Sequence, residues 1–409
     1  MKESNMYRSN RNFSRHRNQN QDGFRNKRSA GFPRRRAGQA SFDPTQVVLQ
    51  SKSQSVQQAA KEEYQLEHQF ADFAISNQLK QNIQKRGYTT PTPIQDKIIP
   101  QVLNARDVVG IANTGTGKTA AFLIPLIDKV LQDKNQKVLI LVPTRELAIQ
   151  LRDELSSFTI GMRLFSTILI GGSSIGRQVT ALSRGQNFVI GTPGRIKDLN
   201  QRGKLRFEQF NNIVLDEVDR MLDMGFVHEI KNIINRLPKV RQSLFFSATM
   251  TSKVQDIMRG FLTDPFQVST KTQDSALNVK QDIVKLKGRS KIDLLQDLLI
   301  TKEFEKVLVF GRTKHGAEKL KKELVKRGFK VDAIHGNKSQ GQRQRALQNF
   351  KRSFVQALIA TDVAARGLDI TDVSHVINYD LPESYETYIH RIGRTGRANS
   401  IGTALTFVE

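Results

Sequence analysis

Short apolar runs alternate with longer amphipathic stretches along residues 68–409. Runs of this length are typical of strands that are buried on both faces, and the stretches between them are long enough for helices. The runs form one series at 137–142, 164–170, 188–190, 213–215 and 244–246, and a second at 283–286, 307–310, 331–334, 357–359, 375–378 and 403–408. We therefore predict an α/β fold with two domains, each built on a parallel sheet.

The first part of the chain lacks this periodicity. Residues 1–40 hold eleven Lys or Arg against two acidic residues, which is a net charge of +9 out of the chain's +25. This composition predicts a disordered tail in which Arg contacts phosphates while Phe13, Phe24 and Phe32 stack on unpaired bases. A solubilising tail or a localisation signal are alternatives. The Gln- and Glu-rich stretch at 46–67 is compatible with a polar helix leading into the first domain.

The remaining composition narrows the class of protein. The sequence contains no Cys, which excludes disulfides, thiolate metal sites and a Cys nucleophile and is typical of a reducing cytoplasm. No apolar run approaches the roughly 18 residues of a membrane span, and the Arg-rich start predicts no signal peptide. A sequence pI of about 10.2 indicates a polyanionic partner, with nucleic acid first and an acidic membrane surface second.

A Gly-rich loop lies between an apolar run at 108–109 and a helix-like stretch at 120–124. The loop consists of Ala112, Asn113, Thr114, Gly115, Thr116, Gly117, Lys118 and Thr119. A strand, such a loop and a helix start form an anion cradle, in which Lys118 reaches the phosphates and Thr119 ligates Mg²⁺. The consensus begins with Gly rather than Ala112, and an ordinary strand-to-helix turn is the alternative.

Acidic residues follow the apolar run at 213–215. Asp216, Glu217 and Asp219 lie where parallel sheets bind their ligands. We predict that Asp216 holds Mg²⁺, largely through water, and that Glu217 orients and deprotonates the attacking water. A helix cap is the alternative.

Near the C-terminus, residues 390–397 combine Arg with Gly. Arginines supplied by a second domain can neutralise the charge on a transferred phosphoryl group. A phosphate-binding loop for nucleic acid explains the same residues equally well.

With these three motifs in order, residues 68–409 resemble a DEAD-box RNA helicase of helicase superfamily 2, with DEVD in place of DEAD. The resemblance implies two RecA-like domains that close on ATP, Mg²⁺ and single-stranded RNA. It divides the chain into a tail and lead-in (1–67), a Q motif (68–96), the ATP-binding domain (97–270), a linker (271–279) and the C-terminal helicase domain (280–409).

The resemblance also assigns roles to individual residues. In the Q motif, Phe70 and Tyr88 would contact the adenine face and Gln95 would bind its edge, while Asp369 would bind the ribose. RNA would be held by Arg145, Gly172, Thr192, Pro193 and Arg195 of the first domain and by Thr361, Arg366 and Gly367 of the second. Ser247, Thr249, His390 and Arg391 would couple the sites. Arg394 and Arg397 would act with Lys118, Asp216 and Glu217 in catalysis.

Two departures from the family pattern bear on this assignment. Asn113 replaces the commoner Gln at a position that need not touch phosphate. Val218 replaces Ala close to the expected contact with Ser247 and Thr249, so the coupling of hydrolysis to unwinding comes into question.

These expectations converge on a cytoplasmic, monomeric, ATP-dependent RNA helicase that binds single-stranded and duplex RNA with little sequence preference. It would act away from membranes, with ribosome or RNA-decay assemblies as candidate partners. A nucleotide-gated RNA clamp or annealing chaperone with weak unwinding is the main alternative. A DNA translocase and a transporter ATPase are disfavoured by the Q motif and by the absence of an apolar span.

Overall fold

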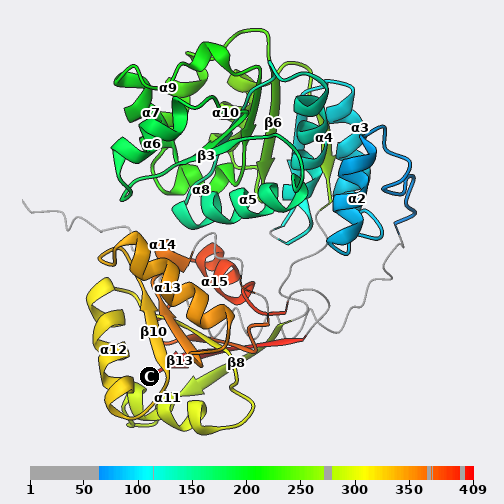
Figure 1. Ribbon diagram of the computed structural model, residues 1–409. Coiled ribbons are helices and arrows are strands. Elements are labelled where there is room, and N and C mark those ends of the chain that lie inside the picture. Colours follow the sequence, from blue (N-terminus) through cyan, green and yellow to red (C-terminus); the bar gives the residue numbers. More distant parts are fainter. Residues whose placement is uncertain (1–63, 114, 271–278, 366–369, 371, 397–400) are drawn as a thin grey trace, which may run out of the picture. The chain divides into compact units, whose positions relative to one another are not determined.

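The computed structural model describes residues 64–113, 115–270, 279–365, 370, 372–396 and 401–409 (Figure 1). The predictions for the tail and for most of the lead-in lie outside these residues, as does the linker predicted at 271–279 except for Val279, which begins a strand. The same holds for five candidate site residues: Thr114, Arg366, Gly367, Asp369 and Arg397. Residues 64–67, the described end of the lead-in, are not helical.

A seven-stranded sheet forms the first lobe, which is the part of the chain from residue 64 to residue 270. Its strands are β1 (Val108–Ile111), β2 (Val138–Leu141), β3 (Ser166–Leu169), β4 (Phe188–Gly191), β5 (Asn212–Leu215), β6 (Gln242–Ser247) and β7 (Phe266–Ser269). They pair in the order β3-β4-β2-β5-β6-β1-β7, and every pairing is parallel. The predicted strands are confirmed with ends shifted by a few residues. The sequence prediction missed β7, an edge strand that is only partly buried and therefore lacks an apolar run.

Helices cover both faces of this sheet (Figure 1). On one face lie α2 (Asn77–Lys85), α3 (Pro93–Leu103), α4 (Lys118–Gln132) and α5 (Arg145–Phe158). On the other lie α6 (Ile175–Leu182), α7 (Pro193–Gln201), the short 3₁₀ helix η1 (Phe207–Gln209), α8 (Val218–Asp223), α9 (Val227–Ile234) and α10 (Ser252–Phe261). Two apolar cores result, one on each face, as expected for a parallel sheet.

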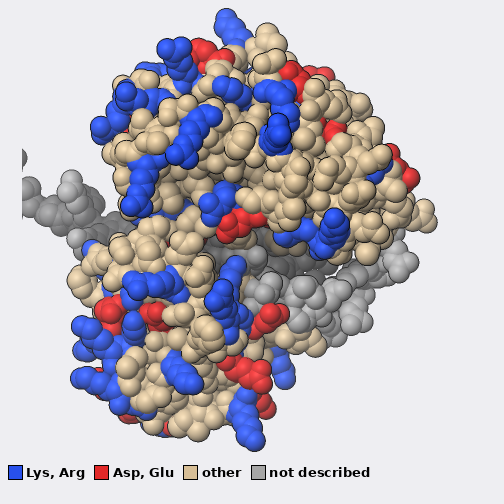
Figure 2. Space-filling model, viewed as in Figure 1, with Lys and Arg blue, Asp and Glu red and all other residues tan. Residues whose placement is uncertain are grey.

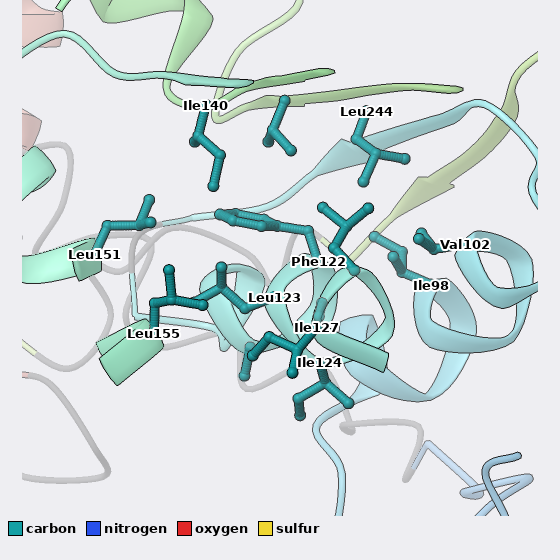
Figure 3. Packing of buried hydrophobic residues seen from close by; sticks show 14 of the residues in the cluster. Ile98, Val102, Phe122, Leu123, Ile124, Ile127, Ile140, Leu151, Leu155 and Leu244 are labelled. Carbon is teal, nitrogen blue, oxygen red and sulfur yellow. The ribbon is translucent and has the colours of Figure 1, made fainter. Parts of the chain in front are cut away.

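The helix α4 is the centre of the first of these cores. Its apolar side chains point toward α3, α5 and the sheet (Figure 3), and the ring of Phe122 packs against that of Phe246 with centroids 5.2 Å apart. Phe122, Leu123 and Ile127 are fully buried, and each such side chain stabilises the fold by about 1.5–3 kcal/mol. This packing fixes the start of α4, and with it the Gly-rich loop that precedes it.

A six-stranded parallel sheet forms the second lobe, from residue 279 onward. Its strands are β8 (Val279–Lys285), β9 (Val307–Phe310), β10 (Val331–Ile334), β11 (Ala357–Ala360), β12 (His375–Asn378) and β13 (Gly402–Val408), in the order β10-β11-β9-β12-β13-β8. The helices are α11 (Lys291–Ile300) and α12 (Lys314–Lys326) on one face and α13 (Gln340–Lys351), α14 (Asp362–Ala365) and α15 (Tyr385–Ile392) on the other. Among the described residues, none of the helices has the length and apolarity required to cross a membrane.

Candidate functional site

The strand order of the first lobe sorts the sequence motifs into two groups at the carboxyl edge of one sheet. The neighbours β5, β6 and β1 end at the acidic cluster, at Ser247 and at the Gly-rich loop. The neighbours β3, β4 and β2 lead into the segments that hold Gly172, Thr192 and Arg145. Parallel strands present their ligand sites at this edge. The first group is therefore a candidate nucleotide site, and the second, which we call the RNA row, is a candidate nucleic-acid surface.

The Gly-rich loop has the backbone geometry of an anion cradle. Gly115 and Gly117 have φ values of +87° and +95°, a conformation that side-chain-bearing residues rarely adopt. The helix α4 begins directly after Gly117, so its free N–H groups and its dipole face the loop. Lys118 Nζ donates a hydrogen bond to the carbonyl oxygen of Ala112 at 2.7 Å. This hydrogen bond joins the first residue of the loop to the first residue of α4.

Gln95 braces this loop from α3. Its Nε2 donates to the carbonyl oxygen of Gly117 at 3.1 Å, and its Oε1 accepts from the Thr92 N–H at 2.9 Å. A Cβ atom at residue 117 would displace the Gln95 amide, and the φ of +95° would strain any other residue there. The contact to adenine stays a prediction, but Gln95 holds the phosphate loop in place.

The Q-motif segment is attached to α3 by Asp96, which the sequence reasoning missed. The buried carboxylate accepts hydrogen bonds from the N–H groups of Glu67 and His68, at 2.8 and 3.1 Å, and from the Tyr64 hydroxyl at 2.8 Å. Burial alone would raise the pKa of Asp96, but the hydrogen bonds from Glu67 and Tyr64, together with one to the His68 ring at 2.7 Å, hold it below its ordinary value. The position directly after Gln95 was the only signal available in the sequence.

The two predicted adenine-site aromatics lie next to each other. The ring of Phe70 packs edge-on against those of Phe73 and Tyr88, at centroid distances of 5.9 and 6.0 Å. Phe70 is buried and Tyr88 is half-buried. Their stacking on adenine stays a prediction.

The acidic cluster is buried. Loss of hydration raises the pKa of Asp216 to about 6, although nearby Lys118 opposes the shift. Glu217 has a positive φ of +53°, and its Oε2 accepts a hydrogen bond from the Arg220 guanidinium at 2.8 Å. Both side chains of this ion pair are 6% exposed. The sequence reasoning did not single out Arg220, because its contact with Glu217 depends on the turn that starts α8.

Asp219 connects the acidic cluster to the end of β6. Its Oδ2 accepts hydrogen bonds from the N–H groups of Ala248 and Thr249 and from the Thr249 hydroxyl, at 3.0, 2.9 and 3.1 Å. The Ser247 hydroxyl donates to the Thr249 carbonyl oxygen at 2.7 Å. Val218 lies fully buried in the apolar core of this face. The carboxylate, rather than the side chain of residue 218, therefore makes the polar link.

In the RNA row, the guanidinium of Arg145 lies against the loop after β3. A Cβ atom at Gly172 would come within 2.2 Å of Arg145 Nη1, and Gly172 has a φ of +75°. The Nη1 atom of Arg195 donates to the carbonyl oxygen of Ser173 at 3.3 Å. Thr192 and Pro193 cap and begin α7 and are buried. Two predicted arginines and Gly172 are thus brought together.

Gln178 of α6 holds the same loop and was also missed. Its side-chain amide accepts from the Ile170 N–H at 3.2 Å and donates to the Ile170 carbonyl oxygen at 3.0 Å. It thereby fixes the chain immediately before Gly172.

In the second lobe, the buried side chain of Arg391 links two segments of the chain. Its guanidinium binds both carboxylate oxygens of Asp362, at 2.6 and 2.7 Å, and donates to the Asp380 carbonyl oxygen at 2.6 Å. Arg394 is buried, and its Nε donates to the His390 carbonyl oxygen at 3.2 Å. Thr361 lies between the end of β11 and the start of α14. The coupling and catalytic roles of these residues stay predictions.

The donor set of the first lobe fits Mg²⁺ bound together with a nucleotide. Thr119 and Asp216 offer a hydroxyl and a carboxylate, the hard oxygen ligands that Mg²⁺ prefers, and it usually needs only one or two of them beside phosphate and water. Within the described ranges no group of three or more metal-ligating side chains occurs.

Two parallel-sheet lobes with a phosphate loop and an acidic strand end define a nucleotide-binding protein of the RecA-like class. The DEAD/DEAH box helicase family matches residues 92–257, and the helicase conserved C-terminal domain matches residues 290–399. The DEAD-box ATP-dependent RNA helicase CshA of Bacillus subtilis is 43% identical over 341 residues, or 83% of this chain and 69% of that protein. The RNA helicase CrhR of Synechocystis sp. is 44% identical over 342 residues, or 83% of this chain and 70% of that protein. The chain therefore belongs to the DEAD-box ATP-dependent RNA helicase family.

Solved structures agree with this assignment. S. cerevisiae Dbp5 bound to RNA and ADP BeF3 is 29% identical, has a TM-score of 0.73 and matches 83% of this chain and 89% of its own. Mss116p bound to ssRNA and AMP-PNP is 27% identical, with a TM-score of 0.74 over 82% of this chain and 72% of its own. The predicted fold of two RecA-like domains is confirmed.

Proposed function

We propose that this chain is an RNA-stimulated ATPase that hydrolyses ATP to ADP and phosphate and locally separates RNA duplexes or remodels RNA–protein complexes. The observation that carries the proposal is the strand order of the first lobe, which supports a nucleotide site and an RNA row at one edge of one sheet. Ligands at neighbouring strand ends can influence each other through the loops that they share.

On the nucleotide side, the chain's own groups divide the work. The N–H groups at the start of α4 and Lys118 bind the phosphates, and Gln95 keeps the loop in register with α3. Glu217 orients the attacking water and accepts its proton. Mg²⁺, held by Thr119 and Asp216, would supply positive charge to the phosphate oxygens.

On the RNA side, Arg145, Arg195 and the backbone at Gly172 bind phosphates and 2′-hydroxyls. Binding of this kind is tolerant of sequence and sensitive to salt. We propose that ATP and RNA together draw the second lobe toward the first, which brings Arg394 and Arg397 to the transferred phosphate and bends the RNA strand. Asp219 transmits the state of the nucleotide site to Thr249.

The finer assignments extend the same proposal. The protein would act in the cytoplasm as a monomer, with ribosome or RNA-decay assemblies as its RNA–protein substrates. The basic tail would add RNA affinity by raising the local concentration of binding groups. The relatives named above are helicases, so the clamp or annealing chaperone is not favoured.

The test compares ATP turnover with and without RNA for the full chain and for Glu217→Gln. RNA should stimulate the wild-type protein, whereas Glu217→Gln should be nearly inactive and still bind ATP. Strand displacement of a short duplex in the same preparation separates a helicase from a clamp. Equal turnover with and without RNA contradicts the proposal.

A further inference from the structure

A groove follows the free edge of β3, the end strand of the first sheet. It encloses about 420 Å³ and is lined by Arg152 of α5, by β3 itself, and by Ser173 and Arg177 at the start of α6. The helices α5 and α6 cover opposite faces of the sheet. The groove therefore lies where both faces end, with one arginine from each flanking helix.

The lining of this edge groove is positively charged. It includes two arginines and no Asp or Glu. Arg152 is paired only with its neighbour Asp153 in the described part of the chain, and both side chains are largely exposed, at 40% and 62%. Such pairs contribute little and exchange readily for another anion. Arg177 is exposed and has no ion pair with any described residue. Both guanidinium groups can therefore bind an added anion.

The backbone of β3 offers donors and acceptors in the same place. The carbonyl oxygens of Phe165 and Leu169 accept hydrogen bonds from the chain around β4. Successive residues of a strand direct their backbone groups to opposite sides, so the N–H and C=O groups of Ser166 and Ile168 point away from β4 and toward the groove. An N–H can donate to a phosphate oxygen, and a carbonyl can accept from a 2′-hydroxyl. Gln178 closes the strand edge at Ile170 and so marks the end of the open stretch.

The groove is continuous with the RNA row. Ser173, which lines the groove, accepts the hydrogen bond from Arg195 through its carbonyl oxygen and directly follows Gly172. Figure 2 shows Lys and Arg side chains gathered over the part of the first lobe where Figure 1 places α6 and α7. The row and the groove therefore meet at Ser173.

We propose that the edge groove binds the phosphodiester backbone of an RNA strand that continues past the RNA row, and so lengthens the RNA footprint of the first lobe. This subsite rests on the proposed function. An acidic peptide that adds a strand to β3 is the competing occupant. The arginines serve either ligand, but the continuity with the row favours RNA.

The test is the affinity of the full chain for two single-stranded RNAs, a short one that fills the row alone and one about three times as long. The double variant Arg152→Gln/Arg177→Gln should weaken binding of the long RNA several-fold and leave the short RNA unchanged. For two lost phosphate contacts, the slope of log affinity against log salt should fall by about 1.4. The matched control is Lys253→Gln/Arg259→Gln on α10, which removes two exposed cations away from β3.

Three outcomes would overturn the subsite: unchanged binding of the long RNA, an equal loss for both RNAs, or the same loss in the α10 control. Loss of affinity for a Glu-rich peptide with RNA binding intact would assign the groove to a protein partner instead. This test measures RNA affinity rather than ATP turnover, so its result is independent of the RNA stimulation that tests the proposed function. If wild-type ATPase is not stimulated by RNA, the proposed function fails, whatever the groove binds.

Discussion

Arg220 donates a hydrogen bond to the carboxylate of Glu217 at 2.8 Å, and both side chains are almost completely buried. The expected base for hydrolysis is therefore held by a residue three positions later in the chain. Glu217 also has a positive φ, which is an unfavourable conformation for a residue with a side chain. The ion pair helps to hold the carboxylate in this strained turn.

Arg220→Met should lower both stability and turnover. Removing one partner leaves a buried, uncompensated carboxylate, which costs about 3–5 kcal/mol. A carboxylate displaced by about 1 Å loses roughly 100-fold in rate. Urea unfolding and kcat measured on the folded protein check the two effects separately. Arg220→Lys is the control, since it keeps the charge and should be affected less. Normal kcat in the folded Met variant would contradict the positioning role.

Asp219→Asn should separate ATP turnover from strand displacement. Oδ2 of the carboxylate accepts three hydrogen bonds from Ala248 and Thr249, and Oδ1 accepts one from the Arg220 N–H. An amide has one oxygen and an NH₂ group that accepts no hydrogen bond, so one of these two sides must be left facing a donor. We expect RNA-stimulated hydrolysis to fall less than duplex separation, both measured on one preparation. Thr249→Val removes only the hydroxyl donor and should give a smaller effect in the same direction. Parallel losses of both activities would argue against a coupling role.

Much of this site could be predicted because its motifs are local. The Gly-rich loop and Asp216 each follow an apolar strand, and the rule that parallel strands end at one edge places them without knowledge of the tertiary structure. Gln178, Asp96 and Arg220 could not be found this way. Each acts through a contact that exists only once a helix has packed or turned: Gln178 with the loop after β3, Asp96 with the Q-motif segment, and Arg220 with Glu217.

The same distinction explains the strand that was missed. In β7 only Val268 is buried, and Phe266 packs against the same core while partly exposed, because an edge strand has a neighbour on one side only. Val218 shows the opposite case. The family resemblance placed it close to the expected contact with Ser247 and Thr249, which suggested an effect on coupling. In the structure its side chain packs into an apolar core, and its neighbour Asp219 makes the polar contact.

Val218→Ala should therefore reduce stability and leave coupling intact. Two buried methyl groups are lost from a fully buried side chain, which costs about 2–3 kcal/mol from transfer and cavity effects. Urea unfolding of the full chain measures the cost. The ratio of base pairs separated to ATP hydrolysed should match that of the wild-type protein. A changed ratio would restore the coupling role for residue 218.

The ligand-free protein should be more stable at neutral pH with Asn in place of Asp216. Burial raises the pKa of this carboxyl from 3.8 to about 6, so the folded state binds its proton more tightly than the unfolded state does. Its contribution to stability is therefore present below about pH 4 and is lost as the pH rises through about 6. Asp216→Asn should raise the melting temperature at pH 7.5, with a gain that shrinks toward pH 4. A gain that does not depend on pH would contradict this assignment.

Arg391 should contribute mainly to the stability of the second lobe rather than directly to coupling. Its side chain is 2% exposed, and it joins Asp362 of α14 to the chain after β12. Arg391→Met leaves Asp362 without its partner, but this carboxylate is 25% exposed and can regain water. Asp362→Asn instead leaves a buried guanidinium uncompensated, so it should destabilise the lobe more than Arg391→Met does. The double variant Arg391→Met/Asp362→Asn should recover part of that loss. Limited proteolysis and urea unfolding of the three variants measure how their stabilities rank. A stable Asp362→Asn protein with impaired duplex separation would instead support a direct coupling role for Arg391.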